Sequence, residues 1–542
     1  MSSREVHACN RKTYCPAKLG SVCALPWHRD NPPSDEGADV VNSPTTPTHP
    51  QSPPASTPVL VVGAGPAGLT AAITLARHGI EVLAVERRPA PSGLPRAASV
   101  STRTMELLRS WGLEQEIRAG GVEVEWKQWV GPTLAATGDA HLTSFPTREQ
   151  SAVLSPTAPA SVTQDHLEPV LLDHLRSFGS ARVEMGTEVA GLDNRSDGVD
   201  VTLRDVESRE TRSVHARFLV AADGARSTVR AALGIAMRGP GRLSQAIGTE
   251  FRAPLWELLG DRRFCIYAVT HPEAAGVFVP AGRGDRWVYG VEHDLARQSV
   301  SSLTKEQAAR LIRLGSGLAD LEPRIERIGT FTFAAQLADR WRDGAVFLTG
   351  DAAHQITPRG GTGMNTAIQS AHDLGWKLAW VLHGWTGPQL LDTYETERRP
   401  VAAHNVAHSA DPLGGTRLAA QELPADLGGR IPHVWLPSHA HTVSTLDLLE
   451  PGLTLFTTHP SASWQRAATT LPGPPLVVHD LDAITARGMG IPHGGALLAR
   501  PDGSTAGWWP AGTEPGTALR HAIHALRAQS DSADRISEGA SS

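Results

Sequence analysis

The residue pattern with the clearest chemical meaning is a glycine-rich turn, Gly63-Ala-Gly65-Pro66-Ala67-Gly68. Apolar residues 59–62 precede it as a strand, and residues 66–78 follow it with a helical pattern. In this context Gly63 permits a tight turn, Gly65 lets the backbone approach a pyrophosphate, and Gly68 lets the helix pack closely on the strand. The N–H groups that open the helix favour bound phosphate.

An acidic residue completes this pattern. Glu86 ends a second apolar segment, residues 81–86, and lies 18 positions after Gly68, where a carboxylate can bond a ribose hydroxyl. Arg87 follows it directly. A glycine-rich turn alone is weak evidence, but strand, turn, helix and acidic residue together predict dinucleotide binding. The motif does not distinguish FAD from NAD.

Two further segments have residue types suited to the same kind of ligand. One contains Asp223-Gly224-Ala-Arg226, and alone it reads most simply as a β-turn. The other is Gly350-Asp351, followed by a loop that begins at Pro358. Glycines in such a loop let the backbone approach a ligand without a Cβ clash, and N–H groups at the start of the next helix stabilise negative charge. That loop and helix start read Pro358-Arg359-Gly360-Gly361-Thr362-Gly363-Met364-Asn365.

Taken together and in this order, the three motifs resemble the fingerprint of the single-component FAD-dependent aromatic hydroxylases, the class A flavoprotein monooxygenases. The resemblance covers roughly residues 58–410. It implies that Asp223 lies near the FAD pyrophosphate, that Asp351 bonds the ribityl chain, and that the loop after Pro358 lies against the isoalloxazine ring. The cofactor-binding residues expected from the three motifs are Gly63, Gly65, Pro66, Ala67, Gly68, Glu86, Arg87, Asp223, Gly350, Asp351, Gly363, Met364 and Asn365.

Two shorter matches extend the resemblance. Pro95-Arg96-Ala97 is similar to the family segment whose arginine contacts the FAD pyrophosphate, so that role is expected for Arg96. Val162-Thr163-Gln164-Asp165 is similar to the segment whose glutamine contacts FAD, so that role is expected for Gln164. The competing interpretation of the second segment is a helix start capped by Asp165.

The resemblance also implies a reaction. NADPH or NADH reduces FAD, O2 adds at flavin C4a, and the hydroperoxide gives one oxygen atom to a phenolic or polycyclic aromatic substrate. Pro358, Gly360 and Gly361 form the loop on the oxygenation side. The setting would be secondary metabolism, antibiotic modification or aromatic catabolism.

Three other residue types invite a role in that reaction. Tyr267 and Tyr289 lie on expected strands, where they either bond a phenolic hydroxyl or pack in the core. His354 has the spacing of a structural neighbour of the flavin rather than of a base. Arg359 is a candidate for binding an anionic substrate.

Other functions fit parts of the pattern. The same fold and motifs host Baeyer–Villiger and epoxidising monooxygenases, O2-independent flavin reductases of the geranylgeranyl reductase type, and non-catalytic FAD-binding proteins. A flavin-dependent halogenase would need a Trp-x-Trp-x-Ile-Pro segment, which this chain lacks. The sequence does not identify the substrate, the position of oxygenation, or the choice between NADPH and NADH.

The expected fold class is α/β with three domains. A Rossmann-like FAD-binding domain of the para-hydroxybenzoate hydroxylase type is interrupted by a mostly antiparallel substrate-binding sheet. A C-terminal domain follows that is similar to the thioredoxin-like appendage of the polyketide, phenol and hydroxyphenylpropionate hydroxylase branches, notably at Leu498-Ala-Arg500-Pro-Asp-Gly503. It lacks cysteines, which excludes a redox role. The expected ranges are 58–123, 160–236 and 338–412 for the first domain, 124–159 and 237–337 for the second, and 415–530 for the third, between disordered segments 1–57 and 531–542.

Composition sets the remaining limits. The 542 residues have a formal net charge of −6, which gives no electrostatic reason to expect a nucleic-acid partner or an anionic membrane. No apolar run approaches the roughly 20 residues of a membrane span. The spacing of the four cysteines, Cys9, Cys15, Cys23 and Cys265, matches no zinc pattern, so no metal site is expected. We expect a cytoplasmic monomer or homodimer.

Overall fold

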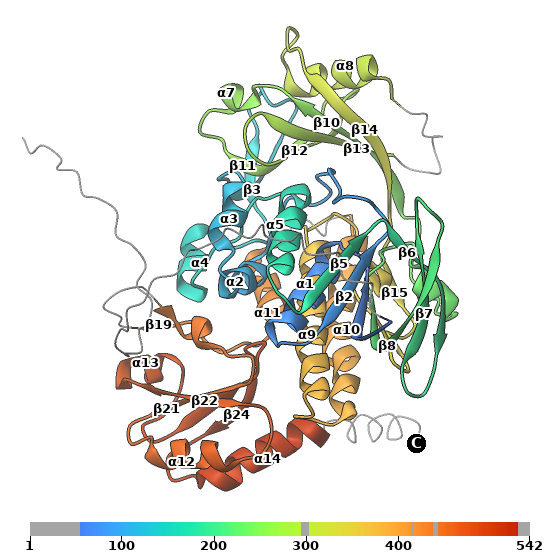
Figure 1. Cartoon of the computed structure of the whole chain (residues 1–542). Helices are drawn as coiled ribbons and strands as arrows, with labels where there is room; N and C mark the ends of the chain where they lie inside the picture. Colours follow the sequence, from blue (N-terminus) through green and yellow to red (C-terminus); the bar gives the residue numbers. More distant parts are fainter. Residues whose placement is uncertain (1–54, 294–302, 413–416, 437–442, 529–542) are drawn as a thin grey trace, which may run out of the picture. The chain divides into compact units, whose positions relative to one another are not determined.

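The computed structural model of the protein describes residues 55–293, 303–412, 417–436 and 443–528 (Figure 1). The disorder expected for 531–542, and for all but the last three residues of 1–57, therefore lies outside the described residues. The same holds for Cys9, Cys15 and Cys23. The first strand begins at Ser56, two positions before the expected start of the fold.

An eight-stranded sheet forms the centre of the first region. Its main path runs β16-β17-β8-β1-β2-β5, and β7 and β6 extend it from β8 as an antiparallel ribbon. Strand β1 pairs in parallel with both β2 and β8, and β17 pairs in parallel with β8. The strands are β1 (Ser56–Val62), β2 (Val82–Glu86), β5 (Ala181–Met185), β6 (Thr187–Asn194), β7 (Val199–Asp205), β8 (Thr211–Ala221), β16 (Arg342–Asp343) and β17 (Val346–Leu348).

Residues 59–62 of β1 are all apolar because both faces of this part of the sheet are covered. Val59, Leu60 and Val61 have no exposed surface. Helix α1 (Pro66–Arg77) follows the glycine turn and packs against α9 (Gly363–Leu382) and α5 (Gln164–Arg176). Gly375 allows the close approach of α9, since a Cβ there would lie 2.8 Å from the Thr74 Cβ.

A seven-stranded sheet forms the second region, with the order β14-β10-β13-β12-β11-β3-β4. Helices α7 (Leu255–Leu259) and α8 (Lys305–Ser316) lie on the side of this sheet that faces away from α1 and α5 (Figure 1). Buried aromatic side chains fill the space between these helices and the sheet. The strands are β3 (Glu125–Gly131), β4 (Asp139–Leu142), β10 (Ser244–Arg252), β11 (Phe264–Val269), β12 (Gly276–Pro280), β13 (Arg286–His293) and β14 (Arg324–Phe333).

The C-terminal region has a four-stranded sheet of order β22-β21-β23-β24, in which only β21 and β22 are parallel. This mixed sheet with flanking helices agrees with the expected thioredoxin-like fold. Its elements are β21 (Leu453–Thr458), α12 (Ala462–Thr470), β22 (Leu476–Leu481), α13 (Ala483–Gly488), β23 (Ala496–Ala499), β24 (Thr505–Trp509) and α14 (Pro515–Ala528).

Further helices and short strands complete the described part of the chain. A small sheet of order β18-β15-β9 lies beside the Asp351 segment. The helices are α2 (Thr102–Ser110), α3 (Glu114–Ala119), α4 (Arg148–Leu154), α6 (Thr228–Ala232), α10 (Asp392–Ala410), α11 (Ala419–Leu427), and the 3-10 turns η1 (Gly350–Ala352), η2 (Pro388–Leu391) and η4 (Thr445–Leu448). The strands are β9 (Met237–Arg238), β15 (Gln336–Ala338), β18 (His354–Gln355), β19 (Trp435–Leu436) and β20 (Val443–Ser444).

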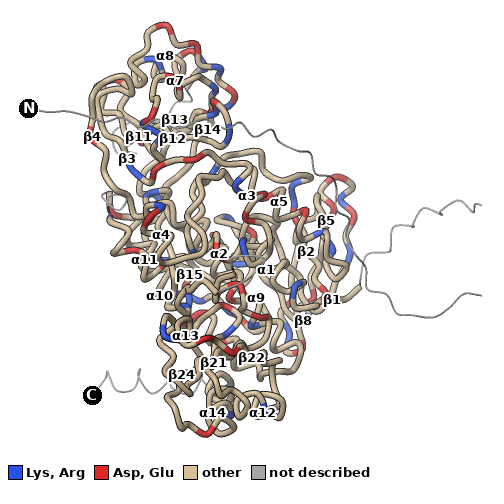
Figure 2. The backbone as a smooth tube through the Cα atoms, turned by 90° about the vertical axis from the view of Figure 1, so that its left-hand side faces the viewer, with Lys and Arg blue, Asp and Glu red and all other residues tan. Residues whose placement is uncertain are grey.

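Charged residues of both signs are interspersed along the described chain (Figure 2). Among the described helices, none combines the length and the apolar character that crossing a membrane requires. Most ion pairs lie at the surface, where each contributes little to stability. Some groups of charges are different because they are buried, and the largest surrounds Lys377.

The group around Lys377 joins α9 and α10 to the C-terminal region. Lys377 has no exposed surface, and its Nζ lies 2.8 Å from Asp373 Oδ2 and 2.9 Å from Glu397 Oε2. Arg500 donates from both terminal nitrogens to Glu397, at 2.8 Å each, and also pairs with Asp502. The ion pairs lower the pKa of Asp502 well below its usual range despite its burial. These contacts explain the Arg500-Pro-Asp502 motif as a structural element.

We expect Lys377→Met to lower the free energy of unfolding by about 3 kcal/mol or more, because it leaves buried carboxylates without their cation. Urea denaturation followed by tryptophan fluorescence measures this change. Arg310→Ala is the matched control, since it breaks the exposed Arg310–Glu273 pair and should leave the midpoint nearly unchanged. Equal effects of the two substitutions would contradict this account of Lys377.

Candidate active site

In the glycine turn after β1, the fold requires glycine at two positions but has room for a side chain at the third. A Cβ at Gly63 would lie 2.4 Å from the Ala222 carbonyl oxygen, and one at Gly68 would lie 1.8 Å from the Gly63 carbonyl oxygen. Gly63 also has a positive φ of 103°. At Gly65 the φ is −80°, and the nearest atom, Glu168 Oε1, would be 4.0 Å away. The protein itself has room for a Cβ at Gly65, so this glycine fits the approach of a phosphate.

Glu86 is held at the end of β2, beside this turn. Its Oε2 accepts a hydrogen bond from the Ala64 N–H at 2.9 Å, and its Oε1 accepts from the Arg88 N–H and Nε. Burial alone would raise the pKa of Glu86, but the hydrogen bonds from Arg88 and Ala64 lower it. The carboxylate is therefore ionised and can accept a hydrogen bond from a hydroxyl group. Arg87, which the sequence favoured, is exposed, and Arg88 is the arginine that orients Glu86.

Asp351 and Arg96 come together from distant parts of the chain. Gly350 has a φ of 59°, and the turn η1 presents the Asp351 side chain to solvent. The surrounding protein raises the pKa of Asp351, and the nearby Arg96 guanidinium lowers it. Within the described residues, no side chain or N–H hydrogen-bonds to this carboxylate. Such an exposed, unpaired acceptor fits a hydroxyl-rich chain, and Arg96 beside it fits a phosphate.

Gln164 begins α5 beside the segment that contains Arg96. Its N–H donates to the Ala97 carbonyl oxygen at 2.8 Å, and its Nε2 donates to Glu168 Oε1 at 2.6 Å. Glu168 is buried and also accepts from the Ser92 N–H. The alternative interpretation, in which Asp165 caps the helix, is wrong, because the N-cap is Thr163 and Asp165 pairs with Arg286. Glu168 was missed because a glutamate inside a helix normally signals a solvated face.

Asp223 uses one carboxylate oxygen in hydrogen bonds to the start of α6, and its other oxygen remains without a partner among the described residues. Its Oδ2 accepts hydrogen bonds from the Thr228 Oγ1 and the Val229 N–H at the start of α6. Its Oδ1 is buried without a hydrogen-bond partner in the described part of the chain. Arg226, by contrast, is exposed. The turn chemistry and the cofactor role expected for Asp223 are therefore compatible.

The glycine loop before α9 is fixed by Asn365. Asn365 Nδ2 donates to the carbonyl oxygens of Ser99 and Gly361, and its Oδ1 accepts from the Ser101 N–H at 2.8 Å. Gly360 and Gly361 have φ values of 81° and 67°, which glycine adopts without strain. This arrangement ties the loop to the segment that contains Arg96.

Helix α9 begins at Gly363 without a side-chain N-cap. The N–H groups of Gly363, Met364 and Asn365 therefore lack the side-chain acceptor that usually satisfies such a helix start. Together with the macrodipole of this long helix, they form a site for negative charge.

His354 is shielded from any reaction. Its ring packs against Trp341 at a centroid distance of 5.3 Å, and both ring nitrogens are buried without a hydrogen-bond partner among the described residues. Burial and the charge of Arg398 lower the pKa of His354 to about 3. The imidazole is therefore neutral and out of reach of solvent, as the structural interpretation of its spacing predicts.

The structure does not bring Tyr267 and Tyr289 to the site. Both are at most 1% exposed and pack in the aromatic core under α7 and α8. The Tyr267 hydroxyl donates to the Arg262 carbonyl oxygen at 2.5 Å, and the Tyr289 hydroxyl donates to that of Ala274 at 2.8 Å. Neither is available to a substrate, so core packing is the correct alternative.

The opposite face of the same sheet is turned toward the glycine loop. Arg359, in that loop, reaches across to Glu292 on β13, with 2.5 Å between Nη2 and Oε1. Ser244 on β10 also donates to Glu292 Oε1, and Arg359 lies over the Phe333 ring at 5.3 Å. Because Glu292 neutralises Arg359, the structure gives no reason to expect an anionic substrate. Phe331 stacks on Phe333 and is 43% exposed.

Three glycines form a side-chain-free strip on this face. Gly248 on β10 is paired with Gly290 on β13 and with Gly329 on β14. Residues directly opposite in antiparallel strands share a face, so the three glycines lie side by side. A Cβ at Gly248 would meet the Phe331 ring at 3.4 Å, which places Phe331 at the edge of the strip. Sequence alternation alone could not identify this face, since the strands show the same period on both sides.

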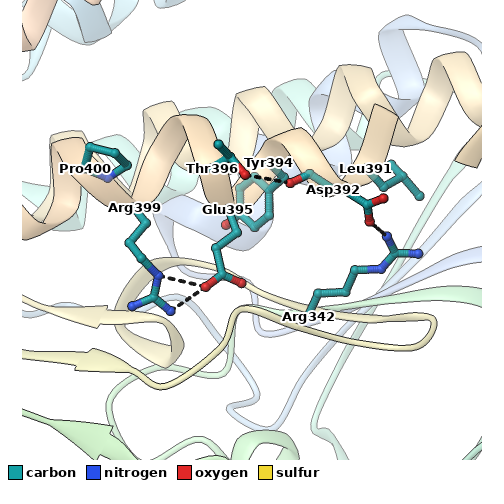
Figure 3. Close-up of a pocket in the computed structure, with 8 residues that line it drawn as sticks. All are labelled: Arg342, Leu391, Asp392, Tyr394, Glu395, Thr396, Arg399 and Pro400. Carbon is teal, nitrogen blue, oxygen red and sulfur yellow. Dashed lines mark hydrogen bonds and ion pairs between the residues drawn. The ribbon is translucent and has the colours of Figure 1, made fainter. Parts of the chain in front are cut away.

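Two pockets can be compared with this site. A pocket of about 410 Å³ lies against α10 (Figure 3), but its charged groups are paired with each other, as Arg342 is with Asp392 and Arg399 with Glu395. None of the expected cofactor residues lines it. A smaller pocket of about 40 Å³ borders the glycine loop and is lined by Gly360, Thr362 and Asn365, among others.

Comparisons with known proteins agree with this arrangement. Residues 56–409 match the model of a family described as FAD binding domain, and residues 425–529 match one described as aromatic-ring hydroxylase, C-terminal. Tetracenomycin A2 monooxygenase-dioxygenase of Streptomyces glaucescens is 34% identical over 546 residues, which cover 87% of this chain and 97% of the relative. Aklavinone 12-hydroxylase RdmE of Streptomyces purpurascens is 35% identical, covering 83% of this chain and 94% of the relative.

Solved structures show the same likeness. Aklavinone-11 hydroxylase in a ternary complex with FAD and aklavinone superposes with a TM-score of 0.79 at 31% identity, covering 87% of this chain and 99% of that one. The flavin-dependent monooxygenase PieE, in complex with FAD and substrate, superposes with a TM-score of 0.80 at 25% identity, covering 87% and 100%. The chain belongs to the family of FAD-dependent aromatic-ring hydroxylases and is an FAD-dependent monooxygenase.

Proposed function

We propose that this enzyme uses NADPH or NADH and O2 to hydroxylate a flat, polycyclic aromatic substrate of the polyketide type. The observation that carries the proposal is the glycine strip with Phe331, on the sheet face turned toward the glycine loop. A surface without side chains beside an exposed aromatic ring suits a planar ligand. The names of the relatives, tetracenomycin monooxygenase-dioxygenase and aklavinone hydroxylase, support antibiotic biosynthesis as the setting.

The residues expected to bind the cofactor support FAD as the group that lies beside the glycine loop. Gly65 leaves room for the pyrophosphate, and Arg96 supplies a positive charge near it. Glu86 and Asp351 offer carboxylates to hydroxyl groups at two separate positions. When bound, FAD supplies the electron transfer from the nicotinamide and the activation of O2, which no side chain performs.

The residues of this chain then orient the reactants and control charge. The uncapped N–H groups at the start of α9 would stabilise negative charge on a flavin bound beside them. The Arg359–Glu292 ion pair, whose charges cancel, connects the glycine loop to the sheet. His354, the imidazole nearest in sequence to the loop, is neutral and enclosed, so we assign it no proton transfer.

The proposed reaction is tested with the purified yellow protein. Phenols and aromatic polyketides should stimulate NADPH or NADH oxidation with O2 uptake, and the product mass should rise by one oxygen atom. Reduction of a substrate double bond without O2 would instead identify a flavin reductase. Insertion of oxygen next to a ketone would identify a Baeyer–Villiger enzyme. Bound FAD with no stimulated oxidation by any aromatic compound would contradict the proposal.

Gly65→Ala should fold normally but lose FAD. The new Cβ has space within the protein and an ordinary φ, so it would collide only with a ligand that approaches the backbone there. We expect the FAD content to fall at least ten-fold, as measured by flavin absorbance, with little change in the Tm of the FAD-free protein. Gly179→Ala is the control, because it also has open space and no positive φ. Full FAD occupancy in Gly65→Ala would exclude this binding mode.

Phe331→Ala should raise the KM for a polycyclic substrate by roughly ten-fold, which corresponds to about 1.4 kcal/mol of lost apolar contact. FAD binding should not change. Thr332→Ala on the same strand, and Tyr289→Phe on the opposite face of the sheet, should leave the KM unchanged. Steady-state kinetics with a single substrate checks all three. A rise in KM for Tyr289→Phe but not for Phe331→Ala would place the substrate elsewhere.

A further inference from the structure

Helices α10 and α11 bring two imidazoles and a carboxylate together outside the cofactor set. His404 and His408 lie one turn apart on α10, so both point from the same helix face. Glu422 on α11 faces them: His404 Nε2 lies 2.9 Å from Glu422 Oε2, and His408 Nδ1 lies 3.4 Å from Glu422 Oε1. Ligand atoms from all three residues lie within 4.8 Å of one another.

Two atoms of this cluster lack a hydrogen-bond partner. His408 Nδ1 and Glu422 Oε1 are buried, and neither forms a hydrogen bond within the described residues. The His404 and His408 rings are also close, with centroids 3.7 Å apart. The hydrogen bond between His404 Nε2 and Glu422 Oε2 accounts for those two atoms but not for His408 Nδ1 and Glu422 Oε1. Buried polar atoms without partners require an explanation, and a bound ion is one.

We propose that His404, His408 and Glu422 bind one divalent transition-metal cation, such as Zn²⁺, with water in the remaining positions. Two histidines at positions i and i+4 of a helix form a common zinc-binding pair. Imidazole and carboxylate ligands suit Zn²⁺ at about 2.0–2.2 Å, whereas Mg²⁺ and Ca²⁺ require mainly oxygen ligands.

Arg417 is the competing cation in this neighbourhood. Its Nη1 lies 3.7 Å from Glu422 Oε1, longer than a hydrogen bond, and its side chain is 35% exposed. The guanidinium can therefore turn toward solvent when the metal binds. The cluster thus keeps its three ligand atoms available.

The cation fixes α11 against α10 and so braces one wall of the small pocket beside the glycine loop. Glu422 and Asp426 of α11 both line that pocket. Asp426 accepts hydrogen bonds from Ser101 Oγ and Gln369 Nε2, and the Ser101 N–H donates to Asn365 at the start of α9. The role is therefore structural, and the site does not depend on the proposed substrate.

Zinc titration of the chelator-treated, flavin-containing full-length protein tests the site. By calorimetry, the wild type should bind one more equivalent of Zn²⁺ than His404→Ala, His408→Ala or Glu422→Gln. The double variant His521→Ala/His524→Ala is the control, because it removes two exposed histidines of α14 and should bind as the wild type does. Flavin absorbance confirms that each variant is folded.

Thermal unfolding supplies the second measurement. Zn²⁺ should raise the Tm of the wild type and of the control, because a ligand that binds only the folded state stabilises it. It should not raise the Tm of the three cluster variants to the same extent. Equal stoichiometry in the wild type and cluster variants, or an equal rise in Tm, would overturn the proposal.

Discussion

Close backbone contact at three glycines brings the distant motifs of this enzyme together. Gly63 lies against the Ala222 carbonyl oxygen at the end of β8, where even a methyl group would not fit. Gly350 lies against Ala67 on α1, and Gly375 lets α9 pack on the same helix. Any side chain at these points would push β8, η1 or α9 away from α1. The cofactor set is therefore assembled by the absence of side chains as much as by the groups that bind.

The FAD-binding region was predictable because its signals are local. Strand β1, the turn at Gly63 to Gly68 and the start of α1 follow from an apolar run, glycine spacing and a proline at the helix start. The family resemblance joined these local signals to Asp223 and Asp351, which propensity alone could not have done. The pairing of β1 with β8 also depends on contacts between segments far apart in the chain.

The sheet of the second region was predictable only in part. Trp287 and Tyr289 alternate along β13 and share one face, but alternation could not say which face α7 and α8 cover. The covered face is determined by tertiary packing, which buries both Tyr267 and Tyr289 in the core. Glu292 and Phe331 carried no local signal, because a charged residue and an aromatic residue on a strand are each ordinary. Lys377 was equally unpredictable, since its burial requires Asp373 on its own helix and Glu397 on another.

The contacts of Arg500 have a consequence for protein engineering. Arg500 meets Glu397, and Arg430 meets Glu106 on α2 with both side chains at most 5% exposed. The C-terminal region thus supplies counter-ions to α10 and α2 of the first region. Chimeras that exchange C-terminal regions between homologous hydroxylases must keep each arginine with its matching glutamate. A chimera without these matching pairs would leave buried charges unpaired at the junction between the two regions, however well their backbones superpose.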